Sequence, residues 1–165
     1  MTRRNLILSS AALAGALIAP SAKAAFSEGT KLPDLSTFGL SGNLPKTEGN
    51  VIYLDFWASW CAPCKASFPI LNRWHEQMNI HGFSVIGISV DESEEDMNRF
   101  LQKNKVSFPV ARDAAHKLVS TANVSTMPTA FIIDRKGIIR HVHSGFHKRD
   151  EPVLFAQINQ LMAQR

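Results

Sequence analysis

Two apolar runs stand out in the sequence, and both predict strands. Val51–Trp57 contains one charged residue, Asp55, and Phe83–Val90 contains none. A continuous apolar run of this kind is typical of a strand that is covered on both faces of a sheet. We therefore predict a central strand over residues 51–57 and a second apolar strand over residues 83–90.

Helices are predicted where apolar residues recur three or four positions apart. Leu71, Trp74 and Met78 follow this spacing, and Pro69 is expected to kink the helix that carries them. Ser93 precedes three acidic residues, a composition that is typical of a helix N-terminus. The predicted helices are residues 62–78, 93–103, 114–122 and a last helix that Asp150 caps, with Pro152 in its first turn.

The remaining segments complete an α/β pattern. A short edge strand is predicted at residues 108–110, and residues 127–134 lead into a strand whose hairpin partner is 138–144. Residues 25–50 are rich in Gly, Pro, Ser and Thr and predict a loose lead-in with at most a short hairpin. The order β-α-β-α-β-α-β-β-α predicts one α/β domain over residues 25–165, with helices on both faces of its sheet.

The first 24 residues have the pattern of a signal peptide. Arg3-Arg4 precedes an apolar run, Leu6–Ala19, which Ala22-Lys23-Ala24 follows. The run is shorter than the roughly 18–20 residues that span a bilayer, so we expect cleavage after Ala24 and a periplasmic protein. The general secretory route and the twin-arginine route are both open, and an uncleaved membrane anchor is the alternative.

The composition fits one exported domain. The chain has 165 residues and a net charge of +4, from 18 basic and 14 acidic residues. Arg3, Arg4 and Lys23 lie in the predicted signal peptide, which leaves 15 basic and 14 acidic residues, a net charge of +1. No nucleic-acid partner is therefore expected.

The only two cysteines, Cys61 and Cys64, lie where the first predicted strand meets the first predicted helix. A Cys-x-x-Cys pair at such a junction indicates redox chemistry or metal binding. Zinc usually takes four ligands, and a disulfide that closes so small a loop adds little stability. We therefore prefer redox chemistry to a metal site or an inert disulfide, and expect no metal and no cofactor beyond the redox-active Cys61–Cys64 disulfide. His141, His143 and His147 are an alternative metal set, although solvated histidines explain them more simply.

Each cysteine has a predicted role. The positive end of the helix and the amides aimed at the sulfur favour the thiolate of Cys61, which is the expected nucleophile. Cys64, one helical turn later and more buried, is expected to resolve the mixed disulfide that Cys61 forms with a substrate. Ala62 and Pro63 limit the freedom of the backbone between the two sulfur atoms. Lys65 either supports the thiolate or is solvated.

Asp55 is the third candidate for catalysis. An ionised carboxylate is costly in an apolar strand, so the pKa of Asp55 is expected to be raised. Placed beneath the cysteine pair, Asp55 would take the proton of Cys64 as that residue resolves the mixed disulfide. The alternative is that the twist of the strand brings Asp55 to solvent or to a backbone amide.

Together these residues resemble the thioredoxin superfamily. Residues 55–65 and Pro69 are similar to its active-site strand, redox motif and kinked helix, and Met127-Pro128-Thr129 is similar to its cis-proline loop. The Leu32-Pro33-Asp34 lead-in, the strand end Val90-Asp91-Glu92 and an extra helix–strand unit between the redox helix and the proline loop resemble the TlpA/ResA/DsbE branch. The resemblance implies a thioredoxin fold, with a central mixed sheet flanked by helices on both faces.

The resemblance also implies substrate contacts. Pro128 is expected to be cis and to help dock substrate chains, with Met127 presenting its backbone to them. Trp60, Ala62 and Pro63 are the other expected contacts.

The chain departs from the family at two positions. Ser67 lies where the extracytoplasmic branch often has a glutamate. Asp55 matches the buried acid of thioredoxin, but Gly87 lies where thioredoxin has the lysine that pairs with that acid.

The sequence thus predicts an exported thiol–disulfide oxidoreductase. The resemblance implies a monomeric reductant of extracytoplasmic protein disulfides, which acts in cytochrome c maturation or copper-site assembly. A membrane electron-donor protein would recharge it. Two alternatives stay open: a disulfide-binding chaperone module, and a thioredoxin-like enzyme with antioxidant activity that reduces peroxide or sulfenate.

Overall fold

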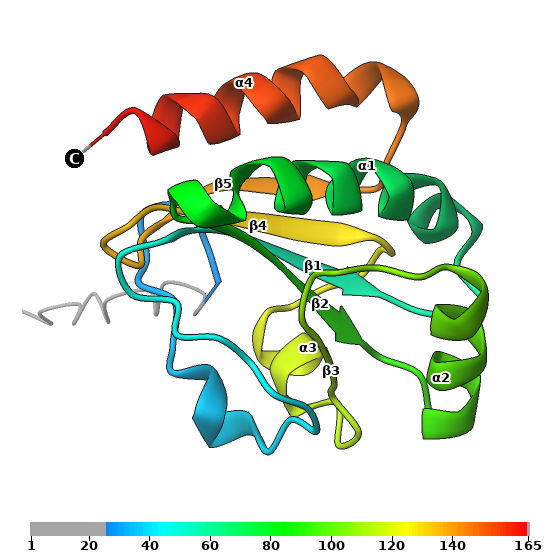
Figure 1. Cartoon of the computed structure of the whole chain (residues 1–165). Coiled ribbons are helices and arrows are strands. Elements are labelled where there is room, and N and C mark those ends of the chain that lie inside the picture. The colour runs from blue at the N-terminus through cyan, green and yellow to red at the C-terminus, as the bar shows by residue number, and fades with distance from the viewer. Residues whose placement is uncertain (1–25, 165) are drawn as a thin grey trace, which may run out of the picture.

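The computed structural model describes residues 26–164, so the predicted signal peptide lies outside the described residues. Within that range, no helix combines the length and the apolar character needed to cross a bilayer. Five strands form one mixed sheet in the order β3-β2-β1-β4-β5 (Figure 1). The strands are β1 (Val51–Trp57), β2 (Phe83–Ser89), β3 (Val110–Arg112), β4 (Thr129–Ile133) and β5 (Ile139–Ser144).

The central strand is β1, which pairs in parallel with β2 and antiparallel with β4. β3 lies parallel to β2 at one edge, and β5 lies antiparallel to β4 at the other. This arrangement confirms the predicted mixed sheet, and β3 is the predicted edge strand.

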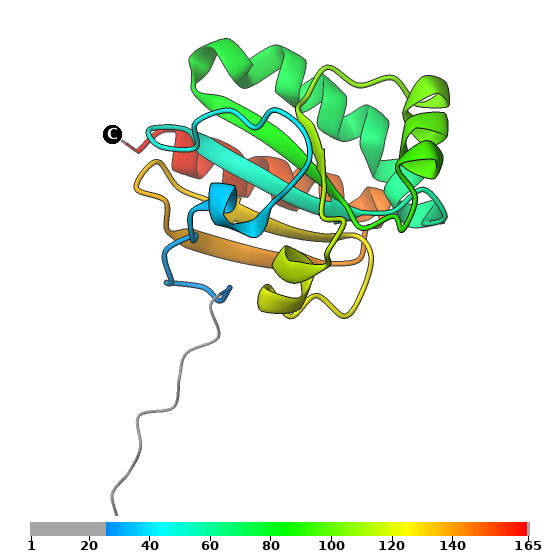
Figure 2. The ribbon, with the colours of Figure 1, turned by 90° about the horizontal axis from the view of Figure 1, so that it is seen from below.

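Helices cover both faces of the sheet, as predicted. α1 and α4 lie on one face, whereas α3 and the short helix η1 lie on the other, as the views from the side and from below show (Figures 1 and 2). α2 connects β2 to β3 and contributes Met97 and Phe100 to the core on the α1 side. The helices are η1 (Leu35–Phe38), α1 (Ala62–Met78), η2 (Asn79–His81), α2 (Glu94–Lys103), α3 (Lys117–Thr121), η3 (Lys148–Asp150) and α4 (Glu151–Met162).

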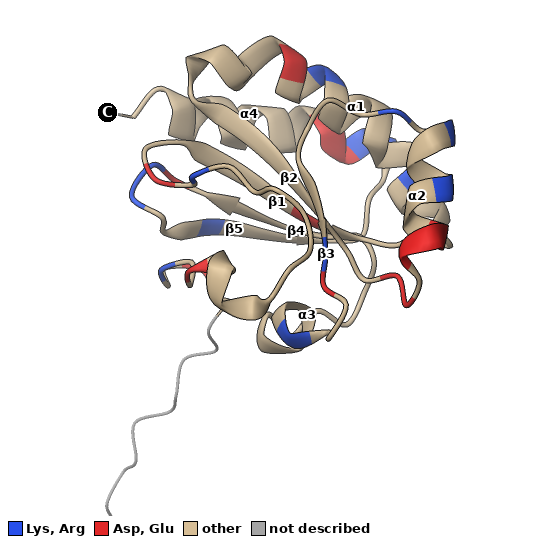
Figure 3. Ribbon diagram, turned by 60° about the horizontal axis from the view of Figure 1, so that its bottom comes forward, with Lys and Arg blue, Asp and Glu red and all other residues tan. Residues whose placement is uncertain are grey.

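The sequence of β1 is apolar except for Asp55 because both of its faces are buried. Val51, Tyr53 and Trp57 point into the core beneath α1, while Ile52 and its alternate neighbours point into the core beneath α3. Charged residues lie mainly on the helices and loops (Figure 3). Asp55 is the only charged residue in β1, β2 and β4.

Two predicted elements begin later than expected. β3 starts at Val110 rather than at Phe108, because Pro109 has no N–H to donate and only its carbonyl pairs, accepting from the Gly87 N–H at 2.9 Å. α3 starts at Lys117 rather than at residue 114. The Asp113 carboxylate accepts hydrogen bonds from two of the first N–H groups of α3, which places the start of that helix.

The start of α4 also differs from the prediction, whereas the lead-in agrees with it. Asp150 does not cap α4 with its side chain: its carboxylate accepts the His147 N–H at 2.9 Å, which closes the short turn η3 before α4. The lead-in forms no hairpin. It makes single bridges at both edges of the sheet, from Lys31 to Ile138 just before β5 and from Ser41 to Arg112 of β3, and its apolar residues cover the α3 face.

Candidate active site

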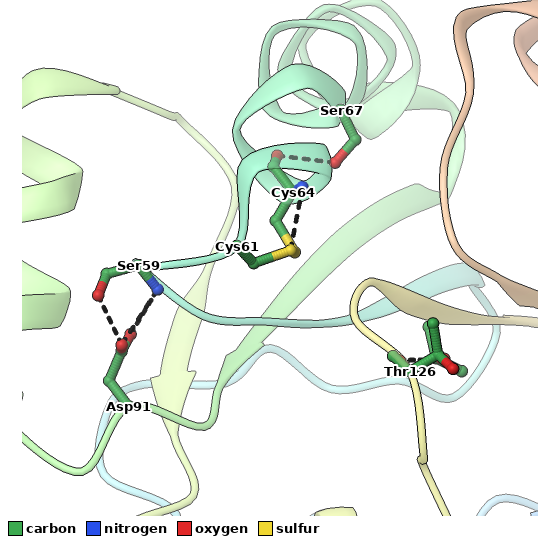
Figure 4. The surroundings of a disulfide bond; sticks show 7 residues. Ser59, Cys61, Cys64, Ser67, Asp91 and Thr126 are labelled. Atoms are coloured by element: carbon green, nitrogen blue, oxygen red, sulfur yellow. Dashed lines mark hydrogen bonds between the residues drawn. A yellow bond between two sulfur atoms is a disulfide. The ribbon is translucent and has the colours of Figure 1, made fainter.

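The two cysteines form a disulfide at the first turn of α1 (Figure 4). Cys61 is the N-cap residue of α1, and its Sγ accepts the Cys64 N–H at 3.2 Å. Cys64 is fully buried, whereas Cys61 retains 5% exposure. A backbone amide is thus aimed at the sulfur of Cys61, and the positive end of the α1 dipole adds to its effect, so this is the sulfur that the site favours as a thiolate.

Three of the residues predicted to contact substrate flank Cys61 in sequence and lie on the surface, whereas Met127 is half-buried and Pro128 is buried. Trp60 is 71% exposed, the largest exposure among the tryptophans, and Ala62 and Pro63 are also exposed. The Met127–Pro128 peptide bond is cis. Thr129, directly after Pro128, pairs with Phe56 near the end of β1, so the proline loop and the redox motif lie at the same end of the sheet.

Asp55 lies inside the protein. Its exposure is 1%, and its Oδ2 atom has no hydrogen-bond partner among the described residues. Burial raises the pKa of Asp55 well above its usual range. This agrees with the expected shift and rules out the alternative in which the strand twists to bring Asp55 to solvent. Because side chains alternate along a strand, Asp55 shares the α1 face of β1 with Tyr53 and Trp57, whose core cluster also contains Cys64.

Small residues flank Asp55 on both neighbouring strands. Gly87 of β2 and Ala130 of β4 are its register partners. A Cβ atom at position 87 would meet Trp57 Nε1 at 3.1 Å and Phe108 Cε2 at 3.2 Å. Two aromatic rings therefore occupy the space that the Cβ atom of a lysine at position 87 would need. Asp55 thus has no cation at its β2 register partner.

Ser67 occupies the position at which the family branch often has a glutamate. It is buried, and its hydroxyl donates to the Cys64 carbonyl at 2.9 Å (Figure 4). Ser67 therefore satisfies a backbone carbonyl in the first turns of α1 and brings no charge to the cysteine pair.

One residue near the redox motif was missed by sequence reasoning. The carboxylate of Asp91, at the end of β2, accepts hydrogen bonds from both the N–H and the hydroxyl of Ser59, two residues before Cys61 (Figure 4). The sequence did carry a signal for a functional role of Asp91, because functional groups of α/β proteins gather at the carboxyl ends of buried strands. The partner, 32 positions earlier in the chain, could not be identified from the pattern.

The histidines of the predicted hairpin do not converge. His143 Nε2 lies 3.5 Å from the Asp150 carboxylate. Over residues 26–164, no three side chains of His, Cys, Asp or Glu are placed to hold a metal ion.

The family model of thioredoxin-like proteins matches residues 49–139, more than half of the chain. The chain belongs to the thioredoxin-like family. Among the relatives of this thioredoxin-like protein is the thiol-disulfide oxidoreductase ResA of Bacillus subtilis, 30% identical over 126 residues, which are 74% of this chain and 70% of that protein. ResA of Bacillus cereus is 31% identical over 112 residues, 66% of this chain and 65% of that protein.

Solved structures agree with this assignment. The thiol:disulfide interchange protein DsbE of Chlorobium tepidum is 33% identical, with a TM-score of 0.75, and the match covers 84% of this chain and 99% of that one. The thioredoxin-like protein therefore has the fold of a ResA- or DsbE-type thiol–disulfide oxidoreductase, and its Cys61–Cys64 pair fits the redox-active dithiol of such an enzyme.

Proposed function

We propose that this protein is an exported monomeric reductant of extracytoplasmic protein disulfides, acting in cytochrome c maturation or copper-site assembly. The observation that carries the redox role is the placement of Cys61 at the start of α1, with the Cys64 N–H directed at its sulfur. The similarity to ResA and DsbE and the predicted signal peptide support an extracytoplasmic setting. The direction, reduction rather than oxidation, rests on the resemblance to the TlpA/ResA/DsbE branch.

The reaction transfers two electrons from the dithiol to the client. The Cys61 thiolate attacks one sulfur of the client disulfide, forms a mixed disulfide and releases the first client sulfur as a thiolate, which takes up a proton from solvent. Cys64 then loses its proton and attacks Cys61 Sγ, which releases the second client sulfur and leaves the Cys61–Cys64 disulfide. A membrane electron-donor protein returns two electrons to restore the dithiol.

Asp55 is the proposed base for the second step. Burial disfavours a charged sulfur at Cys64, so the resolving thiol needs a nearby acceptor at the moment that it attacks. Asp55 lies on the same face of β1 as the core that contains Cys64. To accept that proton Asp55 must be ionised when Cys64 attacks, and because burial raises the pKa of Asp55, its carboxylate is a stronger base than that of an ordinary aspartate.

Substrate binding is assigned to the exposed surface around Cys61. Trp60 offers a large exposed ring beside the nucleophile, with Ala62 and Pro63 next to it. Met127 and Pro128 would present extended backbone to the client chain from the other side.

The experiment that tests this function is trapping of the client. A Cys64→Ala variant expressed in the native host keeps the nucleophile and lacks the resolving thiol, so it should retain its client as a mixed disulfide that reductant releases and mass spectrometry identifies. The matched control, Cys61→Ala/Cys64→Ala, should capture nothing. Capture of cytochrome c or copper-site assembly proteins supports the proposal, and a Cys64→Ala variant that traps no more than the control contradicts it.

The same variants separate the alternatives. A chaperone module would keep its holding activity in Cys61→Ser, whereas a reductase would lose its activity. A peroxide-reducing enzyme would be oxidised by hydrogen peroxide far faster than a free thiol, which stopped-flow measurement detects.

A further inference from the structure

A tight turn immediately precedes the redox motif. The Cys61 N–H donates to the Ala58 carbonyl at 3.1 Å, which closes a four-residue turn with Ser59 and Trp60 at its corner. This turn joins β1 to α1. The direction in which the Trp60 ring and the Cys61 sulfur face a client therefore depends on how rigidly the turn is held.

Asp91 holds this turn from the interior. Its Oδ1 accepts the Ser59 N–H at 3.0 Å and the Ser59 hydroxyl at 2.7 Å, and its Oδ2 lies 3.1 Å from the same N–H. Oδ2 also accepts the Ser89 hydroxyl at 2.8 Å. Both oxygens accept hydrogen bonds and neither donates, which fits an ionised carboxylate. The exposure of Asp91 is only 2%, so water competes little for these bonds.

Asp91 is itself fixed by three strands. It lies two residues after Ser89, the last residue of β2, and its N–H donates to the Ser89 hydroxyl at 3.1 Å. Arg112 of β3 donates to the Asp91 carbonyl at 3.3 Å. The preceding residue, Val90, donates its N–H to the carbonyl of Trp57 at the end of β1. The turn is thus tied to the ends of β1 and β2 and to β3 by hydrogen bonds.

We propose that Asp91 is a positioning residue for Cys61, which fixes the Ala58–Cys61 turn through Ser59 and so presents the nucleophilic sulfur to the client disulfide. This role rests on thiol–disulfide exchange at Cys61 and on no particular client. Attack on a disulfide requires the incoming sulfur to approach along the axis of the S–S bond. Alkylation by a small reagent needs only a thiolate. A loosened turn should therefore slow the first reaction and spare the second.

The chain offers a matched control for Asp91. Asp113 is equally buried, with 1% exposure, and its carboxylate also accepts two backbone N–H groups, at 3.0 and 2.8 Å. Those groups belong to α3, which covers the other face of the sheet. Asp113→Asn therefore removes a comparable buried carboxylate whose hydrogen bonds hold α3 and not the Ala58–Cys61 turn, while the Asp113 N–H keeps its bond to the Ser89 carbonyl.

The experiment compares two reactions of the reduced full chain. One is exchange with a synthetic peptide that carries an oxidised Cys-x-x-Cys disulfide, and the other is alkylation by iodoacetamide. Both rates are measured on the alkaline plateau of their pH profiles, where Cys61 is fully ionised. A change in the fraction of thiolate therefore does not affect the comparison. A misplacement of about 1 Å costs about 10²-fold in rate.

For Asp91→Asn we expect exchange to slow by about tenfold to a hundredfold, while alkylation stays near the wild-type rate. Asp113→Asn should leave both rates unchanged. The proposal is overturned if Asp91→Asn leaves exchange unchanged, if it slows alkylation as much as exchange, or if Asp113→Asn slows exchange to the same extent.

A second pair of variants covers the case in which Asp91→Asn does not fold. Ser59→Ala removes only the hydroxyl donor and keeps the N–H, so exchange should slow by a smaller factor. Where both single variants fold, the double variant should slow exchange by less than the product of the two single-variant factors, because the residues act through a shared contact. Unchanged exchange in Ser59→Ala, or purely multiplicative effects, would overturn the proposal. Because the peptide stands in for any client, failure to trap a client in the host would contradict the proposed pathway without altering this comparison.

Discussion

Asp55 and Gly87 lie directly opposite each other in the β1–β2 pairing, and the indole of Trp57 fills the space beside Gly87. The position at which thioredoxin has a lysine is thus closed by packing, and Asp55 has no cation beside it at position 87. The aromatic packing beside Gly87 therefore excludes the partner that this acid has in thioredoxin.

The first prediction concerns Gly87. Its neighbours Trp57 and Phe108 are buried rings with little room to move, so Gly87→Ala should lower the free energy of unfolding by about 1–3 kcal/mol through overpacking. Gly87→Lys should cost more, because it also buries a charge. Urea unfolding measures both. A Gly87→Lys variant as stable as the wild type would show that the lysine finds room to reach Asp55.

The second prediction is a dependence of stability on pH that Asp55 causes. Its native pKa is raised, so above the ordinary pKa of about 3.9 the native protein holds a proton that the unfolded chain has lost. The free energy of unfolding therefore falls as pH rises from this value to the native pKa. Asp55→Asn removes this penalty and should be increasingly more stable than the wild type as pH rises above 4, by about 1.4 kcal/mol for each unit of pKa shift.

Asp134 provides the opposite case. Burial alone would raise its pKa, but the Ile138 N–H, the Arg140 guanidinium and the Lys136 N–H lower the pKa of Asp134 overall. Its contribution is present at neutral pH and is lost as pH falls through the lowered native pKa. Urea unfolding from pH 3 to 8 should therefore show Asp134→Asn destabilised at neutral pH, with the difference shrinking in acid. Parallel pH profiles for Asp55→Asn and Asp134→Asn would refute the assignment.

The third prediction separates the two chemical steps. If Asp55 takes the proton of Cys64, Asp55→Asn should slow resolution of the mixed disulfide by about 10²-fold or more and leave the attack by Cys61 near its wild-type rate. Single-turnover mixing with a disulfide peptide, quenched with acid, should show the mixed disulfide accumulating. Asp134→Asn is the control and should slow neither step. Equal slowing of attack and resolution would count against proton transfer by Asp55.

The fourth prediction concerns His75, which lies in α1 and anchors β2. Its Nδ1 accepts the Val85 N–H at 3.2 Å, so the native ring is neutral. Burial lowers the pKa of His75, and the charge of Glu76 opposes the shift. Stability should therefore be lost as pH falls from about 6.5 to the lowered native pKa. His75→Asn keeps an acceptor without titrating, and it should flatten the urea-unfolding profile between pH 5 and 7. An unchanged slope would assign the acid sensitivity to other groups.

The central strand and the redox pair could be predicted because each carries its signal within a few residues. An apolar run buried on both faces has no other common explanation in an α/β chain. Two cysteines three positions apart at a strand–helix junction place both sulfur atoms on one helical turn, whatever the rest of the fold does. The burial of Asp55 followed from its neighbours in sequence for the same reason.

The features that the sequence did not predict depend on contacts between distant segments. The hydrogen bonds between Ser59 and Asp91 join residues 32 positions apart, and the local sequence around either residue does not identify its partner. The late start of α3 depends on the Asp113 side chain, which replaces a local cap. In the same way, Asp150 is a residue type typical of a helix cap, but its carboxylate accepts the His147 N–H before α4 begins.

The most direct test of this account is a redox titration of the full chain, in which free thiols are alkylated at each potential and located by mass spectrometry. We expect Cys61 and Cys64 to interconvert between a dithiol and an intramolecular disulfide in a single two-electron transition. For a reductant, the midpoint should lie near the thioredoxin value of about −270 mV. A pair that never interconverts would contradict the redox assignment, and a midpoint near about −120 mV, typical of a strong oxidant, would contradict the proposed direction.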